Sequence, residues 1–136
     1  MLYNSTDVDV ICVGNASYDL VFQVDQHPQP DDKITARALL QCGGGPASNA
    51  AVTVARLGLK AAFIGNVGND EFGTRHLQEL LQNDVITEYV IIGNNPIPLS
   101  SIFVKPDGSR LVVNHKATMD YLSSDYANDI NLFCRV

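Results

Sequence analysis

The sequence predicts an α/β domain, in which helices pack against a largely parallel sheet, with a small β-sheet appendage. Strand-like apolar runs alternate with helix-like segments through the first 92 residues, which is typical of layered α/β domains. A hairpin signal follows, because Pro-Asp-Gly-Ser at 106–109 separates two β-rich runs at 99–104 and 110–114. These turn residues between two such runs predict an antiparallel pair.

The first core strand is expected at 8–13, a continuous apolar run that ends at Gly14. Such a run predicts a strand buried on both faces, as in parallel sheets. A turn-rich connector at 27–32 precedes a segment that mixes apolar and polar residues, which predicts an exposed strand. The further strands are expected at 20–24, 33–42, 61–65 and 89–92.

Two helices are expected between these strands. Pro46 suits the first position of a helix, because its missing N–H has no partner to lose there, and Gly58 suits the position just after its end. Asp70 is a good N-cap for a second helix over 71–82. The leucines at 77, 80 and 81 are expected to share the buried face of that helix.

Composition excludes several classes of function. The 136 residues suit one domain, and the net charge of -6 with only 9 Lys and Arg argues against a nucleic-acid partner. No apolar run approaches the ~20 residues of a membrane span, and no signal peptide is visible. We expect a cytoplasmic protein with no membrane partner. Its cysteines are expected to be free buried thiols, and its histidines to lie on the surface without metal; they are Cys12, Cys42, Cys134, His27, His76 and His115.

The run Gly43–Gly45 lies between a predicted strand and a predicted helix. Glycines allow a ligand to approach the backbone closely, and the free N–H groups of a helix N-terminus can face it. A bare triple glycine is equally compatible with a plain tight turn. The chain has no Gly-Lys-Ser/Thr segment, and Gly14 stands alone where a dinucleotide fingerprint needs three glycines.

The spacing around this run is more specific. Gly44 and Gly45 are followed by Asn49 and Ala51, then by glycines after six and nine further residues, Gly58 and Gly68. In this pattern the chain resembles the N-terminal signature of the ribokinase-like (PfkB) carbohydrate kinases. The resemblance covers residues 8 to about 122 and implies the N-terminal portion of a three-layer, Rossmann-type domain with a β-sheet lid. Residues 1–136 would be that portion, with lid segments at about 33–42 and 99–114.

The resemblance also implies a set of sugar-binding residues: Asp19, Gly44, Gly45, Asn49 and Arg110. Asp19 follows the first strand, at the edge of the sheet where α/β proteins bind ligands. A carboxylate there can accept hydrogen bonds from two sugar hydroxyls, although a solvated turn residue would look the same. Arg110 follows the hairpin turn and is also compatible with a solvated charge that discourages edge pairing.

Enzymes of this family transfer the γ-phosphoryl group of ATP to a sugar hydroxyl with Mg²⁺. Their second signature, a Gly-Ala-Gly-Asp type segment that carries the general base, does not occur in this sequence. We therefore expect a sugar-binding part that is inactive alone, with no catalytic residue or metal site, and with no ATP or Mg²⁺ bound. A sugar, polyol or nucleoside is the expected partner, and a homodimer through the lid is possible. A non-catalytic sugar-binding or structural module is the alternative.

Overall fold

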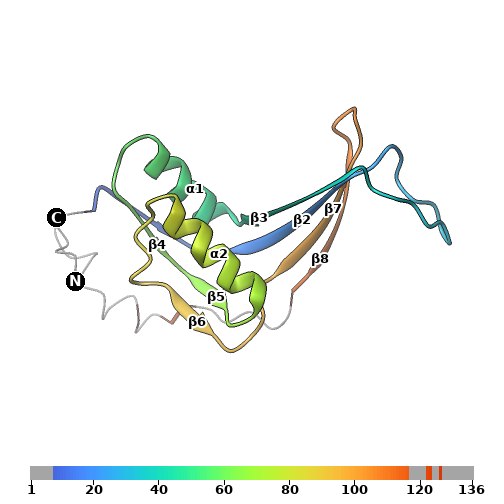
Figure 1. Cartoon of the computed structure of the whole chain (residues 1–136). Coiled ribbons are helices and arrows are strands. Elements are labelled where there is room, and N and C mark those ends of the chain that lie inside the picture. The colour runs from blue at the N-terminus through green and yellow to red at the C-terminus, as the bar shows by residue number, and fades with distance from the viewer. Residues whose placement is uncertain (1–7, 117–121, 124–125, 127–136) are drawn as a thin grey trace.

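The computed structural model describes residues 8–116, 122–123 and 126, and they form an α/β arrangement (Figure 1). No helix within these residues is long and apolar enough to cross a membrane. The helices are α1 (Pro46–Arg56) and α2 (Glu71–Gln82). The strands are β1 (Val10–Val13), β2 (Ser17–Gln23), β3 (Ala38–Gly44), β4 (Ala61–Ile64), β5 (Asn66–Gly68), β6 (Ile91–Gly93), β7 (Leu99–Val104) and β8 (Arg110–His115).

The parallel part of the fold is built from β1, β4, β5 and β6. β1 pairs with β4, and β6 pairs with β5, which follows β4 after Gly65. Helix α1 connects β1 to β4 by way of β2 and β3, and α2 connects β5 to β6. Both helices lie on the same side of these strands (Figure 1), as right-handed crossovers that advance in one direction require. The predicted α/β class is confirmed.

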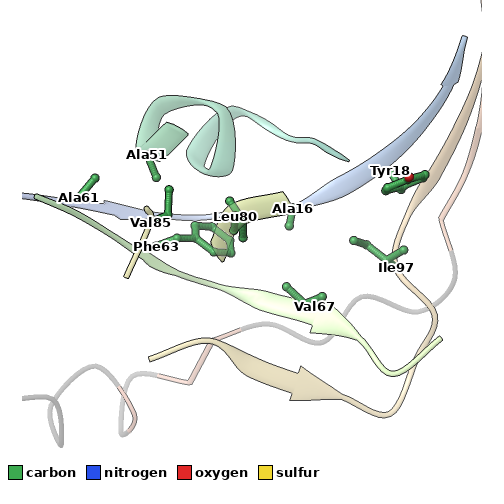
Figure 2. Packing of buried hydrophobic residues seen from close by; sticks show 9 residues of the cluster. All are labelled: Ala16, Tyr18, Ala51, Ala61, Phe63, Val67, Leu80, Val85 and Ile97. Atoms are coloured by element: carbon green, nitrogen blue, oxygen red, sulfur yellow. The ribbon is translucent and has the colours of Figure 1, made fainter. Parts of the chain in front are cut away.

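The hydrophobic core lies between these strands and the two helices (Figure 2). Phe63 from β4, Ala51 from α1 and Leu80 from α2 are fully buried. Burying one large apolar side chain contributes about 1.5–3 kcal/mol. The small Ala51 and Ala61 let α1 approach the sheet closely, and Tyr18 and Ile97 extend the core toward the start of β2.

The ends of α1 are as the sequence predicts. The helix begins at Pro46, and Gly58 follows its end with φ +90°. The Gly58 N–H donates to the Ala55 carbonyl at 2.9 Å, and the Leu59 N–H donates to the Val54 carbonyl at 3.3 Å. This pair of bonds is the Schellman motif, in which glycine adopts the left-handed conformation at low cost.

The N-cap of α2 is also as predicted, but its buried face is not. Asp70 Oδ1 accepts hydrogen bonds from the Gly73 N–H at 3.3 Å and from the Ile97 N–H at 3.0 Å. The expectation that three leucines share one buried face is wrong, because Leu81 is 55% exposed. The residues that α2 buries are Gly73, His76 and Leu80.

A second, four-stranded sheet has the order β3-β2-β7-β8. β7 and β8 form the predicted hairpin, and Asp107 Oδ1 accepts from the Ser109 N–H at 2.9 Å in its turn. β2 pairs antiparallel with β3 and parallel with β7. The far end of this sheet projects well beyond the two helices (Figure 1).

Two strand predictions need correction. The first strand is not buried on both faces: Val13 is 49% exposed, because β4 is the neighbour of β1 within the described part of the chain. The strand expected at 33–42 begins later and ends later, at Ala38–Gly44. Gly43 and Gly44 belong to it because they pair with Tyr18 and Ser17 of β2.

Candidate functional site

The candidate site lies where β2 and β3 meet the N-terminus of α1. Ser17 pairs with Gly44, and Asp19 pairs with Cys42 in the next register position of the same face. A Cβ atom placed on Gly44 would stand 2.6 Å from Asp19 Oδ2 and 2.9 Å from Ser17 Oγ. The Asp19 carboxylate therefore lies directly against the Gly44 backbone, and glycine is required there to leave room for it.

Gly45 makes the turn from β3 into α1. Its φ is +103°, which disfavours residues with a side chain. A Cβ atom there would also stand 2.4 Å from the Asn15 carbonyl oxygen. The loop after β1 is thus packed against the start of the helix, which brings the polar segment ahead of β2 and the glycine run into contact.

Among the residues that the structure describes, no side chain caps the N-terminus of α1. The buried Ser48 hydroxyl donates to the Gly44 carbonyl at 2.7 Å, which ties the first turn to the glycine run. Asn49 lies in the same turn with an exposed side chain, and its N–H donates to the Gly45 carbonyl at 3.0 Å. The first N–H groups of a helix carry partial positive charge, so this end can receive hydroxyl or anionic oxygens.

Helix α2 supports the glycine run from the other side. Glu79 Oε2 accepts a hydrogen bond from the Gly43 N–H at 2.6 Å. A Cβ atom on Gly43 would stand 1.7 Å from His76 Nδ1, so the imidazole occupies the space that a side chain at position 43 would take. His76 is 2% exposed, and the expectation that it lies on the surface is wrong.

The electrostatics link these groups. Burial lowers the pKa of His76, while the Glu79 and Asp19 carboxylates act in the opposite direction. Burial raises the pKa of the half-buried Cys42 thiol, and the same two carboxylates raise it further. Cys12 and Cys42 are free thiols, half-buried rather than fully buried as expected; Cys134 lies outside the described residues.

Sequence reasoning missed both His76 and Glu79. The only sequence signal for them is that they stand three residues apart, and such residues share a face of a helix. That spacing does not reveal what the shared face meets.

The structure does not bring Arg110 to this site. Asp19 is in register with Ser100 on β7, and Ser100 is in register with Asn114 on β8. Arg110 lies four residues from Asn114 along β8, opposite Val104. With ~3.3 Å per residue and ~4.8 Å between strands, about 16 Å separates Arg110 from Asp19 along the sheet.

Comparisons with known proteins show the family to which the chain belongs. The sequence model of the pfkB family carbohydrate kinases matches residues 7–133. The chain belongs to this family. It is 32% identical to the ribokinase of Bacillus subtilis over 118 residues, which is 86% of this chain and 40% of that enzyme. It is 26% identical to the nucleoside kinase of Methanothermobacter thermautotrophicus, over 79% of this chain and 35% of the relative.

Solved structures show the same fold. A ribokinase candidate from Agrobacterium tumefaciens superimposes with a TM-score of 0.77 at 33% identity, covering 90% of this chain and 41% of that one. The chain therefore spans about 40% of the length of the proteins it matches. The predicted ribokinase-like fold is confirmed for the part of it that the chain covers.

Proposed function

We propose that this chain forms the sugar-binding part of an ATP-dependent kinase that phosphorylates a hydroxyl of a sugar or nucleoside. The observation that supports this best is the contact of the Asp19 carboxylate with the Gly44 backbone beside the start of α1. Among the described residues, no side chain or N–H donates a hydrogen bond to that carboxylate. Its oxygens can accept hydrogen bonds from two adjacent hydroxyls of a ligand.

The glycine run and helix α1 would complete the recognition. Gly44 and Gly45 carry no side chain, so a sugar ring can approach the backbone at this turn. The N–H groups at the start of α1 point out of the helix and can bind a hydroxyl oxygen. Asn49, exposed in the same turn, adds an amide that both donates and accepts. The names of two relatives, a ribokinase and a nucleoside kinase, support the proposal of a ribose-like ligand for this chain.

The four-stranded sheet is proposed as the lid, with its β3 segment and its β7–β8 hairpin corresponding to the expected segments at 33–42 and 99–114. It contains Asp19 itself on β2, so a movement of the sheet would carry a sugar-binding residue with it. Closure over a bound sugar would exclude water, which protects a phosphoryl group from hydrolysis. Exposed apolar residues Val112 and Val113 on β8 support the expectation of a lid-mediated homodimer.

ATP and Mg²⁺ are assigned to the whole enzyme. Within 8–116, 122–123 and 126, no cluster of three or more His, Cys, Asp or Glu could hold a metal ion. The sequence also has no Gly-Ala-Gly-Asp type segment, where the family carries its general base. The role proposed for the described residues is to bind and orient the sugar.

Binding to the 136-residue chain tests this proposal directly. Calorimetry with D-ribose, D-fructose and adenosine should reveal saturable binding of at least one, without phosphoryl transfer when ATP and Mg²⁺ are added. Asp19→Asn should weaken that binding about 10- to 100-fold, because a hydrogen bond to a charged group contributes about 1.5–3 kcal/mol. Asp31→Asn is the matched control, since it removes an exposed carboxylate where φ is +66°, a conformation that Asn tolerates.

Two results would contradict the proposal. One is the absence of saturable binding for every ligand in this panel by a chain that circular dichroism shows to be folded. The other is an affinity of Asp19→Asn equal to that of the Asp31→Asn control.

A further inference from the structure

Helix α2 places a buried histidine beneath the candidate site, and nothing in the proposed sugar contacts uses it. His76 is 2% exposed, and neither of its ring nitrogens has a hydrogen-bond partner among the described residues. A buried polar group without a partner costs about 1–3 kcal/mol. An apolar residue would fill this space without that cost, so the position of the imidazole calls for an explanation.

The ring lies against the peptide that leads into the glycine run. A Cβ atom on Gly43 would stand 1.7 Å from its Nδ1 and 2.1 Å from its Cε1. The N–H of the same residue donates to Glu79 Oε2 at 2.6 Å. Gly43 is followed by Gly44, whose backbone lies against the Asp19 carboxylate. One face of α2 therefore supports β3, the strand that carries the turn at 43–45 proposed to bind the sugar.

We propose that His76 is a positioning residue for this turn, and that the turn is held in its sugar-binding form only while the imidazole is neutral. The inference rests on the proposed function of the site. A neutral imidazole brings one N–H donor and no charge into the buried space. An imidazolium has two N–H donors and a charge, and a buried charge requires an acceptor.

Of the two carboxylates within reach, Glu79 already accepts from the Gly43 N–H, and Asp19 is the proposed acceptor of the sugar. Glu79 on α2 and Asp19 on β2 are the carboxylates that act on the imidazole. Cys42 on β3 and Tyr18 on β2 are the other ionisable groups of the strands that pack against this part of α2, and β5 has none. If the imidazolium attracts Glu79, the Gly43 N–H loses its acceptor. If the imidazolium attracts Asp19, the sugar hydroxyls lose the carboxylate proposed to accept their hydrogen bonds.

Protonation of His76 should therefore weaken sugar binding. A single proton limits the effect to about tenfold in Kd per pH unit below the pKa of His76. Burial lowers that pKa, so the loss should begin below the ordinary histidine value of ~6.5. A histidine with a merely structural role would change stability when mutated but would leave the pH dependence of affinity unchanged.

The experiment measures the Kd of D-ribose, D-fructose and adenosine from about pH 8 to about pH 5, where His is the side chain that titrates. The chain should lose affinity as the pH falls. The affinity of the His76→Leu and His76→Gln variants should not depend on pH. Either variant suffices if the other fails to fold. His27→Gln is the matched control: it removes a half-buried imidazole at the far end of the four-stranded sheet, where His27 Nε2 lies 3.2 Å from the Phe103 carbonyl oxygen.

Acid also affects folding, and the two effects must be separated. Because the pKa of His76 is lowered in the folded chain, the unfolded chain binds more protons below pH ~6.5. The free energy of unfolding then falls with falling pH, by at most about 1.4 kcal/mol per unit. Affinities are compared only at pH values where circular dichroism shows the chain to be folded.

A second readout needs no sugar. In NMR spectra of the free chain, the Gly43 and Gly44 amide shifts should titrate together with the His76 ring, and should not titrate in this way in the His76→Leu variant. If no ligand binds but these amides follow His76, the proposed function fails while the link between His76 and the turn holds. Amides that ignore the His76 titration, or a His76→Leu variant with the pH profile of the unchanged chain, would overturn the inference.

Discussion

Replacing Gly43 by alanine should destabilise the chain through one identifiable contact. The new methyl group would stand 1.7 Å from His76 Nδ1 and 2.1 Å from His76 Cε1, whereas favourable contacts between such atoms lie at about 3.5–4.0 Å. The overlap of nearly two ångströms involves a ring that is 2% exposed, so the ring cannot move into solvent. Overpacking of a core typically costs about 1–3 kcal/mol, and occasionally more. We expect a loss at or above the upper end of this range.

The contact can be isolated by a double-mutant cycle. His76→Ala alone should cost less than the about 2–5 kcal/mol of an apolar large-to-small substitution, because it also removes buried nitrogens without a partner, which cost about 1–3 kcal/mol. In the chain that carries both changes, the methyl group added at position 43 enters the space that the imidazole has left. The double variant should therefore be more stable than the sum of the single changes predicts, by about 1–3 kcal/mol, which is within the usual range for residues in contact.

Urea unfolding followed by circular dichroism measures these differences. Gly58→Ala is the control for the general effect of the substitution. The φ of Gly58 is +90°, but apart from its chain neighbours no atom of the described residues lies within 4 Å of the added methyl group. Its cost should be that of the left-handed conformation alone, about 1–2 kcal/mol. Strict additivity of Gly43→Ala and His76→Ala, or a cost for Gly43→Ala no larger than for Gly58→Ala, would refute the reasoning.

Two further substitutions test the fold and the limits of the site. Asp70→Ala removes the acceptor of both the Gly73 and Ile97 N–H groups. It should lower the free energy of unfolding by about 2–4 kcal/mol, because losing a helix cap costs about 0.5–2 kcal/mol and leaving a buried amide without a partner costs about 1–3 kcal/mol. A urea midpoint equal to that of the unchanged chain would contradict this. Arg110→Ala should leave sugar affinity within about twofold, because along the sheet the residue lies about 16 Å from the site; a roughly tenfold loss in calorimetry would show that the hairpin reaches it.

The sequence predicted the elements whose signals are local. Pro46 and Gly58 mark the ends of α1 because the first lacks an N–H and the second takes a positive φ. Asp70 caps α2, and Asp107 Oδ1 closes the hairpin turn by accepting from the Ser109 N–H. Each of these features depends on atoms within a few residues, so residue type and spacing suffice to place it.

The features that the sequence did not predict, the place of Arg110 and the burial of His76, depend on contacts between distant segments of the chain. The sequence predicts the hairpin but not that β7 pairs with β2. This pairing fixes the register of the strands, which places Arg110 far from Asp19. His76 stands among three leucines of α2, and an exposed histidine was the natural expectation. Its burial follows from the absence of a side chain at Gly43, on a strand 33 positions earlier in the chain, and no pattern within the helix reveals that space.

The three consecutive glycines meet three different neighbours, which explains why the run has this length. Gly43 leaves room for the His76 ring of α2, Gly44 leaves room for the Asp19 carboxylate of β2, and Gly45 passes close to the Asn15 carbonyl with a positive φ. A tight turn needs a glycine only where φ is positive, so a turn alone accounts for Gly45 and not for the other two. Gly44 makes room for the Asp19 carboxylate, which is proposed to bind sugar, and Gly43 makes room for the His76 imidazole, which can change its charge. The run is therefore better understood as the place where a helix, a strand and a loop meet around the candidate site than as a flexible connection.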